Sequence, residues 1–191
     1  MRITLGLFSA LLMIHPHFLC TGFGKSLFFD LAKSKGAIVA NMGDIIREKA
    51  KERGEDTGTT ARKLREEHGQ YIVAKLTVQK IKAFLEENPD ADTILVEGIR
   101  SPYEIEMFDE SFENFTTVSV FASPKTRFER VTARNREDDS NVYEDFKERD
   151  ERELNLGIGT VMATSDYYII NEDDFESYEK EVVSFFNKVM D

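Results

Sequence analysis

Short runs of apolar and β-branched residues alternate with helical segments along most of the chain, and this alternation limits the fold more than any other feature. From residue 25 onward, four such runs are nearly continuous, as in parallel strands that are buried on both faces. They span residues 37–40, 93–96, 117–121 and 167–170. Strands that are separated by helices are typical of a parallel sheet covered on both faces, so the sequence predicts an α/β fold in three layers.

The helical segments carry start signals and apolar faces. Ser101-Pro102-Tyr103-Glu104 combines an N-cap residue, a proline at the first helical position and a capping glutamate, and Ser123-Pro124 repeats the first two of these elements. Two sets of apolar residues each fall on one helical face and predict core-facing surfaces. The sets are Ala74, Val78, Ile81 and Leu85, and Phe175, Tyr178, Val182, Phe185 and Val189.

Length and charge exclude several classes of protein. A chain of 191 residues is long enough for one sizeable core, so we expect a single domain over residues 1–191. It carries 36 acidic and 25 basic residues, for a formal charge of -11, whereas nucleic-acid binders need clustered excess cations. Cys20 is the only cysteine, which excludes an internal disulfide and fits a reducing, cytoplasmic location.

Residues 1–21 predict either an irregular N-terminus or the first strand. Met1-Arg2 and the apolar run at 3–14 have the charge and length of a secretory signal, but the run is too short to span a membrane. Phe18-Leu19 is too bulky for a lipoprotein-type cleavage site before Cys20. The first strand is supplied either by 17–20 or by 2–7, and an error in this part of the sequence is a third alternative.

Gly22-Phe23-Gly24-Lys25-Ser26 precedes a helical segment and has the composition of a phosphate-binding loop. Glycines let backbone N–H groups turn toward phosphate oxygens, and the helix directs its positive end at the same anion. Lys25 would reach the outer phosphates, and the Ser26 hydroxyl would hold Mg²⁺. The full pattern G-x-x-x-x-G-K-[ST] has a glycine where this chain has Leu19. That departure motivates an alternative, a nucleotide-binding protein without catalytic activity.

Two later segments resemble acceptor-binding elements of adenylate kinases. Gly43-Asp44-Ile45-Ile46-Arg47 is similar to the G-D-x-[LI]-R element, whose arginine grips the phosphate of the acceptor monophosphate. Val96-Glu97-Gly98-Ile99-Arg100 resembles the D-G-x-x-R region, with glutamate for aspartate and the arginine one residue early. The resemblance implies that Asp44, Arg47 and Arg100 bind the acceptor. It also implies that Glu97 orients Mg²⁺ together with Ser26.

The charge-rich segment at 130–155 resembles the lid of the same kinases. Arg136-Glu137-Asp138-Asp139, with Arg149 further along, is similar to the R-x-D-D…R pattern, whose arginines neutralise the transition-state charge. Arg130, Arg134, Arg136 and Arg149 are the lid candidates, and the catalytic assignments are Lys25, Arg136 and Arg149. A solvated helix pair is the simpler alternative for the segment.

The order of these motifs over residues 22–190 resembles an archaeal family of P-loop kinase-like proteins related to adenylate and dephospho-coenzyme A kinases. Ser165-Asp166-Tyr167-Tyr168-Ile169-Ile170-Asn171 adds a likeness to the A-D-Y-x-I-x-N last strand of small-molecule P-loop kinases. The resemblance implies a three-layer P-loop NTPase fold with roughly five parallel strands, helices on both faces and a small helical lid.

The same resemblance implies ATP and Mg²⁺ as cofactors and a small nucleotide-type substrate as the partner, with neither nucleic acid nor a membrane. Dephospho-coenzyme A kinases have an arginine four residues after the acceptor-site aspartate. Asp44 and Arg47 are three residues apart, and this spacing favours a nucleoside monophosphate, although dephospho-coenzyme A stays an alternative acceptor. An exported binding module, suggested only by the N-terminal apolar run, is a further alternative.

Overall fold

A parallel sheet flanked by helices forms the centre of the molecule. The computed structural model describes residues 11–16, 25–91, 93–134 and 142–190. The strands are β1 (Leu11–Pro16), β2 (Ile38–Asn41), β3 (Thr93–Ile99), β4 (Phe115–Phe121) and β5 (Tyr167–Ile170). They lie in the order β2-β3-β1-β4-β5, and each described pairing is parallel. The prediction of an α/β fold with helices around a parallel sheet is confirmed.

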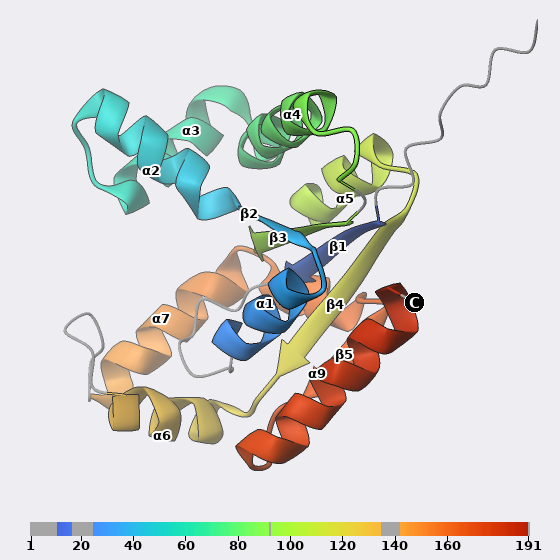
Figure 1. The fold of residues 1–191 in the computed structure, drawn as a ribbon. Helices are drawn as coiled ribbons and strands as arrows, with labels where there is room; N and C mark the ends of the chain where they lie inside the picture. Colours follow the sequence, from blue (N-terminus) through green and yellow to red (C-terminus); the bar gives the residue numbers. More distant parts are fainter. Residues whose placement is uncertain (1–10, 17–24, 92, 135–141, 191) are drawn as a thin grey trace, which may run out of the picture.

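The helices cover both faces of the sheet (Figure 1). Their bounds are α1 (Lys25–Ser34), α2 (Met42–Arg53), α3 (Thr57–His68), α4 (Ile72–Glu87), α5 (Pro102–Ser111), α6 (Pro124–Arg134), α7 (Tyr143–Asn155), α8 (Ile158–Ala163) and α9 (Phe175–Met190). Strand arrows point toward the left in Figure 1, where α2 and α3 lie above the sheet and α6 and α7 below it. The carboxyl ends of the strands therefore face the region between these two helix pairs.

Strand β1 lies between the two ranges that the sequence suggested for the first strand. Residues 2–7 and 17–20 both fall outside the described residues, whereas β1 spans Leu11–Pro16 and pairs with β3 on one side and β4 on the other. Pro16 is the last residue of the strand, and the register shifts between His15 and Pro16. Proline lacks the N–H that a central strand position would use, so a strand end is where it can be tolerated.

Adjacent residues of β3 pack into two different cores. Leu95 is fully buried with Phe28 of α1 and Phe186 of α9, on one face of the sheet. Ile94 and Val96 are buried on the opposite face, in a cluster with residues of α2, α4, α5 and α8. Successive side chains of a strand point to opposite faces, so this alternation places β3 between two helical layers.

The apolar face predicted for α9 is largely confirmed. Tyr178, Val182 and Phe185 are buried in the core with α1. Phe175 is 65 % exposed, so the prediction was wrong at this residue. It is the first residue of α9, and the buried part of the helix begins one turn later.

Charged residues of α6 and α7 are packed against each other, which corrects the expectation of a solvated helix pair. Asp150 and Glu153 of α7 are buried, as is Arg127 of α6. Arg127 donates from both Nη atoms to the two carboxylate oxygens of Asp150, with an Nη1 to Oδ1 distance of 2.8 Å. Its guanidinium lies 5.0 Å from the ring centroid of Phe146. Phe146, Asp150 and Glu153 are three or four residues apart, so these buried side chains lie on one face of the otherwise polar helix α7.

Within the described parts of the chain, none of the helices combines the length and the apolar composition that a membrane crossing requires.

We expect Phe186→Ala to lower the free energy of unfolding by about 3–5 kcal/mol, because the side chain is fully buried and its ring centroid lies 4.8 Å from that of Phe28. Urea denaturation measures the change. Phe175→Ala on the same helix is the matched control, and the exposed site should change stability by less than about 0.5 kcal/mol. A loss below about 1 kcal/mol for Phe186→Ala would contradict the assignment of this core.

Candidate functional site

The predicted phosphate loop lies between a central strand and a helix. The end of β1 pairs with the end of β3, with Pro16 opposite Ile99, and α1 begins at Lys25. Gly22, Phe23 and Gly24 lie outside the described residues. Lys25 and Ser26 are the first two residues of α1, so the positive end of the helix lies at the predicted loop. The backbone order is that of a phosphate loop, whose contacts to phosphate stay a prediction.

Asn41 joins the ends of β2 and β3 to the start of α2. It lies opposite Glu97 in the sheet register, and its Nδ2 donates to Glu97 Oε2 at 3.0 Å. Its Oδ1 accepts from the backbone N of Gly43 at 2.8 Å and so caps α2. One amide side chain therefore orients both the carboxylate of Glu97 and the helix that carries the predicted acceptor residues.

Glu97 has the chemistry to provide one ligand of a Mg²⁺ ion. Its half-buried carboxylate lies on β3 opposite His15 of β1, next to the strand end that leads to the predicted loop. Mg²⁺ binds carboxylate and hydroxyl oxygens and keeps several waters, and substrate phosphates supply further ligands. The described residues contain no group of three or more His, Cys, Asp or Glu that could hold a metal ion. Glu97 therefore fits Mg²⁺ as one ligand beside phosphate oxygens, and the metal-binding role of Ser26 stays a prediction.

Asp44 and Arg47 are paired with each other on the surface at the start of α2. Arg47 Nε donates to Asp44 Oδ1 at 3.2 Å, and Nη2 donates to the same oxygen. A Cβ added at Gly43 would lie 3.1 Å from Arg47 Nη1, so the glycine leaves room for the guanidinium to fold back over the helix start. Asp44 thus holds Arg47 in place at this surface.

A cavity of about 370 Å³ brings three arginines together. It lies among α2, α3, α4 and the turn from β3 to α5, and Arg47, Arg65 and Arg100 all line it. Two of them were predicted to bind the acceptor, and the structure places both around one cavity although they are far apart in the sequence. Guanidinium groups on several walls make this cavity suited to an anion.

Glu104 fixes two of these arginines. Its side chain is almost fully buried, and its Oε2 accepts from the backbone N of Arg100 at 2.7 Å and of Ser101 at 3.2 Å. Its Oε1 accepts from Arg65 Nη2 at 3.2 Å. The predicted capping glutamate of α5 is therefore confirmed, and its second oxygen positions Arg65 in the cavity wall.

Sequence reasoning assigned no role to Arg65 or Glu153. Arg65 pairs with a residue 39 positions away, so no local spacing marks it. Glu153 lies on α7, and its Oε2 is 3.5 Å from Arg100 Nε. Burial raises the pKa of the Glu153 carboxyl, while Arg100 and Arg149 oppose that shift. Burial likewise lowers the pKa of Arg100, and Glu153 and Glu104 oppose it. The only sequence signal for Glu153 is the regular spacing of the buried positions of α7. The many charged residues of this helix make that spacing hard to recognise.

The predicted lid arginines separate into two groups. Arg149 is half-buried on α7 and acts electrostatically on Arg100 and Glu153. Arg130 of α6 instead donates to backbone oxygens of the segment after β5, at 2.9 Å from Asn171 O and 3.2 Å from Asp173 O. Arg136 lies outside the described residues, as does the side chain of Arg134. Of the lid candidates whose side chains are described, Arg149 is the one that acts on the arginine-lined cavity.

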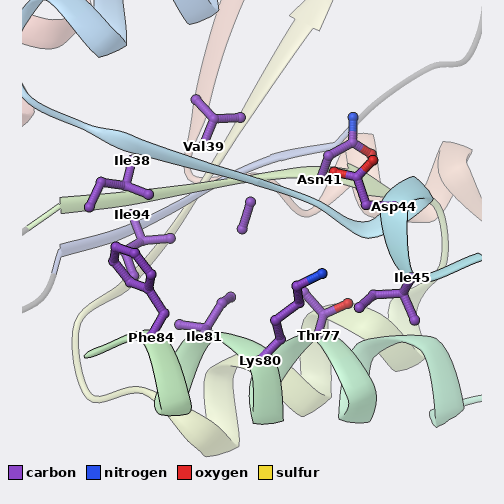
Figure 2. Close-up of a pocket in the computed structure, with 11 residues that line it drawn as sticks. Ile38, Val39, Asn41, Asp44, Ile45, Thr77, Lys80, Ile81, Phe84 and Ile94 are labelled. Carbon is purple, nitrogen blue, oxygen red and sulfur yellow. The ribbon is translucent and has the colours of Figure 1, made fainter. Parts of the chain in front are cut away.

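A second, mostly apolar cavity of about 240 Å³ lies under the β2 edge of the sheet. Figure 2 shows Ile38, Ile81 and Phe84 around it, with Asn41 and Asp44 at the end nearest α2. Asp44 thus borders this cavity, while its partner Arg47 lines the arginine-lined one. An acceptor bound at Arg47 would have an apolar recess on the other side of this ion pair.

No protein-family model matches the chain. It is similar to proteins described as UPF0200 proteins from archaea. The relative from Methanothermobacter thermautotrophicus is 47% identical over 168 residues, which cover 88% of this chain and 86% of that protein. The relative from Pyrococcus furiosus is 41% identical over 177 residues, which cover 89% of this chain and 94% of that protein.

Solved structures show a similar fold at low sequence identity. Shikimate kinase from Bacteroides thetaiotaomicron matches with a TM-score of 0.60 and 14% identity, covering 94% of this chain and 98% of that one. A structure from Thermus thermophilus matches with a TM-score of 0.61 and 17% identity, covering 94% of this chain and 97% of the other. The α/β fold is thus similar to that of shikimate kinase, and at this identity the likeness concerns the fold alone.

We expect Glu104→Ala to destabilise the protein by about 3–5 kcal/mol, because it leaves the buried end of Arg65 without its carboxylate and two backbone amides without an acceptor. Asp109→Ala on the exposed side of α5 is the control and should change stability by less than about 0.5 kcal/mol. Thermal and urea unfolding compare the two variants. Equal effects would show that Glu104 acts only as one more surface charge.

Proposed function

The chain belongs to the UPF0200 family, and we propose that it is an ATP-dependent, Mg²⁺-requiring kinase that transfers phosphate to a small nucleotide-type acceptor. The observation that carries the proposal is the arginine-lined cavity at the carboxyl edge of the sheet, next to the strand whose end leads to the predicted phosphate loop. Ligands of open α/β sheets bind at this edge. The similar fold of shikimate kinase supports the same chemical class.

On the donor side, the backbone amides of Gly22 to Gly24 and the amine of Lys25 would hold the phosphates of ATP at the start of α1. Ser26 and Glu97 would hold Mg²⁺, directly or through water. When bound, Mg²⁺ supplies charge neutralisation on the phosphate oxygens. Asn41 keeps the carboxylate of Glu97 oriented through its 3.0 Å hydrogen bond.

On the acceptor side, Arg47 and Arg100 would bind the acceptor's phosphate. Asp44 pairs with Arg47 and so serves to orient the guanidinium. Phosphoryl transfer to a phosphate oxygen needs no strong base, because that oxygen is already ionised at neutral pH. The pairing therefore favours a nucleoside monophosphate, and dephospho-coenzyme A is the alternative acceptor.

Arg136 and Arg149 would supply positive charge to the transferring phosphoryl group. That charge is spread over the equatorial oxygens in the transition state, so catalysis consists mainly of positioning and electrostatic stabilisation. Arg149 already acts on Arg100 electrostatically, and α7 would bring it toward the reacting groups.

We expect Lys25→Ala to weaken Mg-ATP binding by roughly 10- to 100-fold, the value of one lost charge-assisted hydrogen bond. Isothermal titration calorimetry measures the affinity. Lys33→Ala, at the exposed end of the same helix, is the matched control and should bind like the wild type. Equal affinities of Lys25→Ala and the wild type would remove the phosphate-loop assignment.

We expect Arg100→Ala to lower kcat/KM for the acceptor by roughly 100-fold, about 2.7 kcal/mol of transition-state binding, with little change in Mg-ATP affinity. Coupled assays with each nucleoside monophosphate and with dephospho-coenzyme A identify the acceptor. Arg62→Ala, on the exposed face of α3, is the control. A wild-type protein that binds Mg-ATP but turns over none of these acceptors would contradict the kinase and support the non-catalytic alternative.

A further inference from the structure

Four arginines act on one carboxylate of α7, that of Glu153. Glu153 Oε2 lies 3.5 Å from Arg100 Nε, and Arg149, Arg152 and Arg65 also act on this carboxylate electrostatically. Arg65 and Arg100 are wall residues of the acceptor cavity. The carboxylate of Glu153 therefore lies beside a guanidinium of the cavity wall, although Glu153 is not itself among the residues that line the cavity.

The contact between Arg100 and Glu153 is loose although both groups are largely removed from water. Side-chain exposure is 10% for Glu153 and 27% for Arg100. Among the described residues, neither Arg100 Nε nor Glu153 Oε2 has a hydrogen-bond partner. A buried carboxylate without hydrogen bonds is costly, so this pair contributes little to holding the structure together.

The neighbouring buried acid on the same helix shows what a structural ion pair looks like in this protein. Asp150 accepts two hydrogen bonds from Arg127, in the planar bidentate geometry that stabilises such pairs. Asp150 thus fastens α7 to α6, and it does so without Glu153. The helix keeps its anchor when Glu153 changes partners.

Glu104 and Glu153 also differ in how firmly they are held. Glu104 accepts from two backbone amides and from Arg65. Glu153 is held near Arg100 only by charge. An incoming dianionic phosphate offers more acceptor oxygens than a carboxylate and could bond Arg100 Nε directly. Glu153 is consequently the anion of this cluster that a ligand can replace.

We propose that Glu153 is an internal counter-anion of the acceptor cavity, which the phosphate of the acceptor displaces from Arg100. That this phosphate belongs to the acceptor rests on the proposed function. Glu153 is a positioning residue: it neutralises Arg100 in the empty cavity and sets the threshold of negative charge that a ligand must exceed to bind. Acceptors with a weak negative charge therefore bind poorly. A ligand with a single carboxylate gains little binding free energy when it replaces the Glu153 carboxylate at Arg100.

The test is a titration with inorganic phosphate, measured by calorimetry in a Lys25→Ala background so that the predicted phosphate loop contributes equally and weakly throughout. We expect Glu153→Gln to bind phosphate roughly three- to tenfold more tightly than the parent, because the competing charge is gone. Glu151→Gln, on the exposed side of α7, removes the same charge from the protein and should leave the affinity unchanged. With Arg100→Ala added, Glu153→Gln should no longer tighten binding.

Weaker or unchanged phosphate binding by Glu153→Gln would overturn the proposal, because a purely structural role predicts a loss. If Glu153→Gln fails to fold, Glu153→Asp keeps the charge but withdraws it from Arg100, and an unchanged affinity there would overturn the proposal as well. Absence of phosphate binding in every variant would overturn the anion site itself. None of these outcomes depends on ATP binding or turnover, so a failure of the kinase assignment is recognised separately.

Discussion

Parallel pairing of the strands is the constraint on which the candidate site depends. In a parallel sheet all strand-to-helix turns lie at one edge, so residues that follow different strands are brought together without any special contact between them. The register places the end of β1 beside the end of β3, and the end of β2 on the other side of β3. The predicted phosphate loop, Glu97 and the start of α2 consequently share one edge.

At that edge of the sheet, Glu104 fixes the positions of the turn after β3 and of the Arg65 side chain. Its carboxylate closes the turn between β3 and α5 and at the same time holds Arg65 from α3. Gly98, at φ +105°, lets the backbone turn next to Met42, where a Cβ would come within 3.3 Å of the Met42 side chain. Arg100 lies two residues after Gly98, and its backbone N donates to Glu104 while its side chain lines the cavity. A rigid backbone that carries a guanidinium held only by a loose ion pair with Glu153 is suited to a preorganised anion site.

The features that could be predicted from the sequence are those with a local physical cause. A continuous apolar run located β5 to the residue, although this edge strand leaves Tyr168 and Ile170 about half exposed and is not buried on both faces as predicted. Capping chemistry placed the start of α5. Arg47 and Arg100 could be identified because each belongs to a segment that follows a strand and resembles an acceptor-binding element of adenylate kinases. Arg65 and Glu153 could not, because their partners are distant in the sequence. The first strand was misplaced for a similar reason: only its neighbours β3 and β4 determine which part of a long apolar stretch pairs.

The strong negative charge of the chain and its cationic cavity are compatible because they act over different distances. Most acidic residues lie on solvated surfaces, where their interactions are screened within about 8 Å at physiological ionic strength. The interactions of Arg65 and Arg100 are partly buried and therefore much less screened. An anionic ligand would therefore be repelled weakly at long range and attracted more strongly on contact. Under the proposed function, recognition depends on groups within the cavity, which would allow a protein of charge -11 to bind a highly charged small molecule.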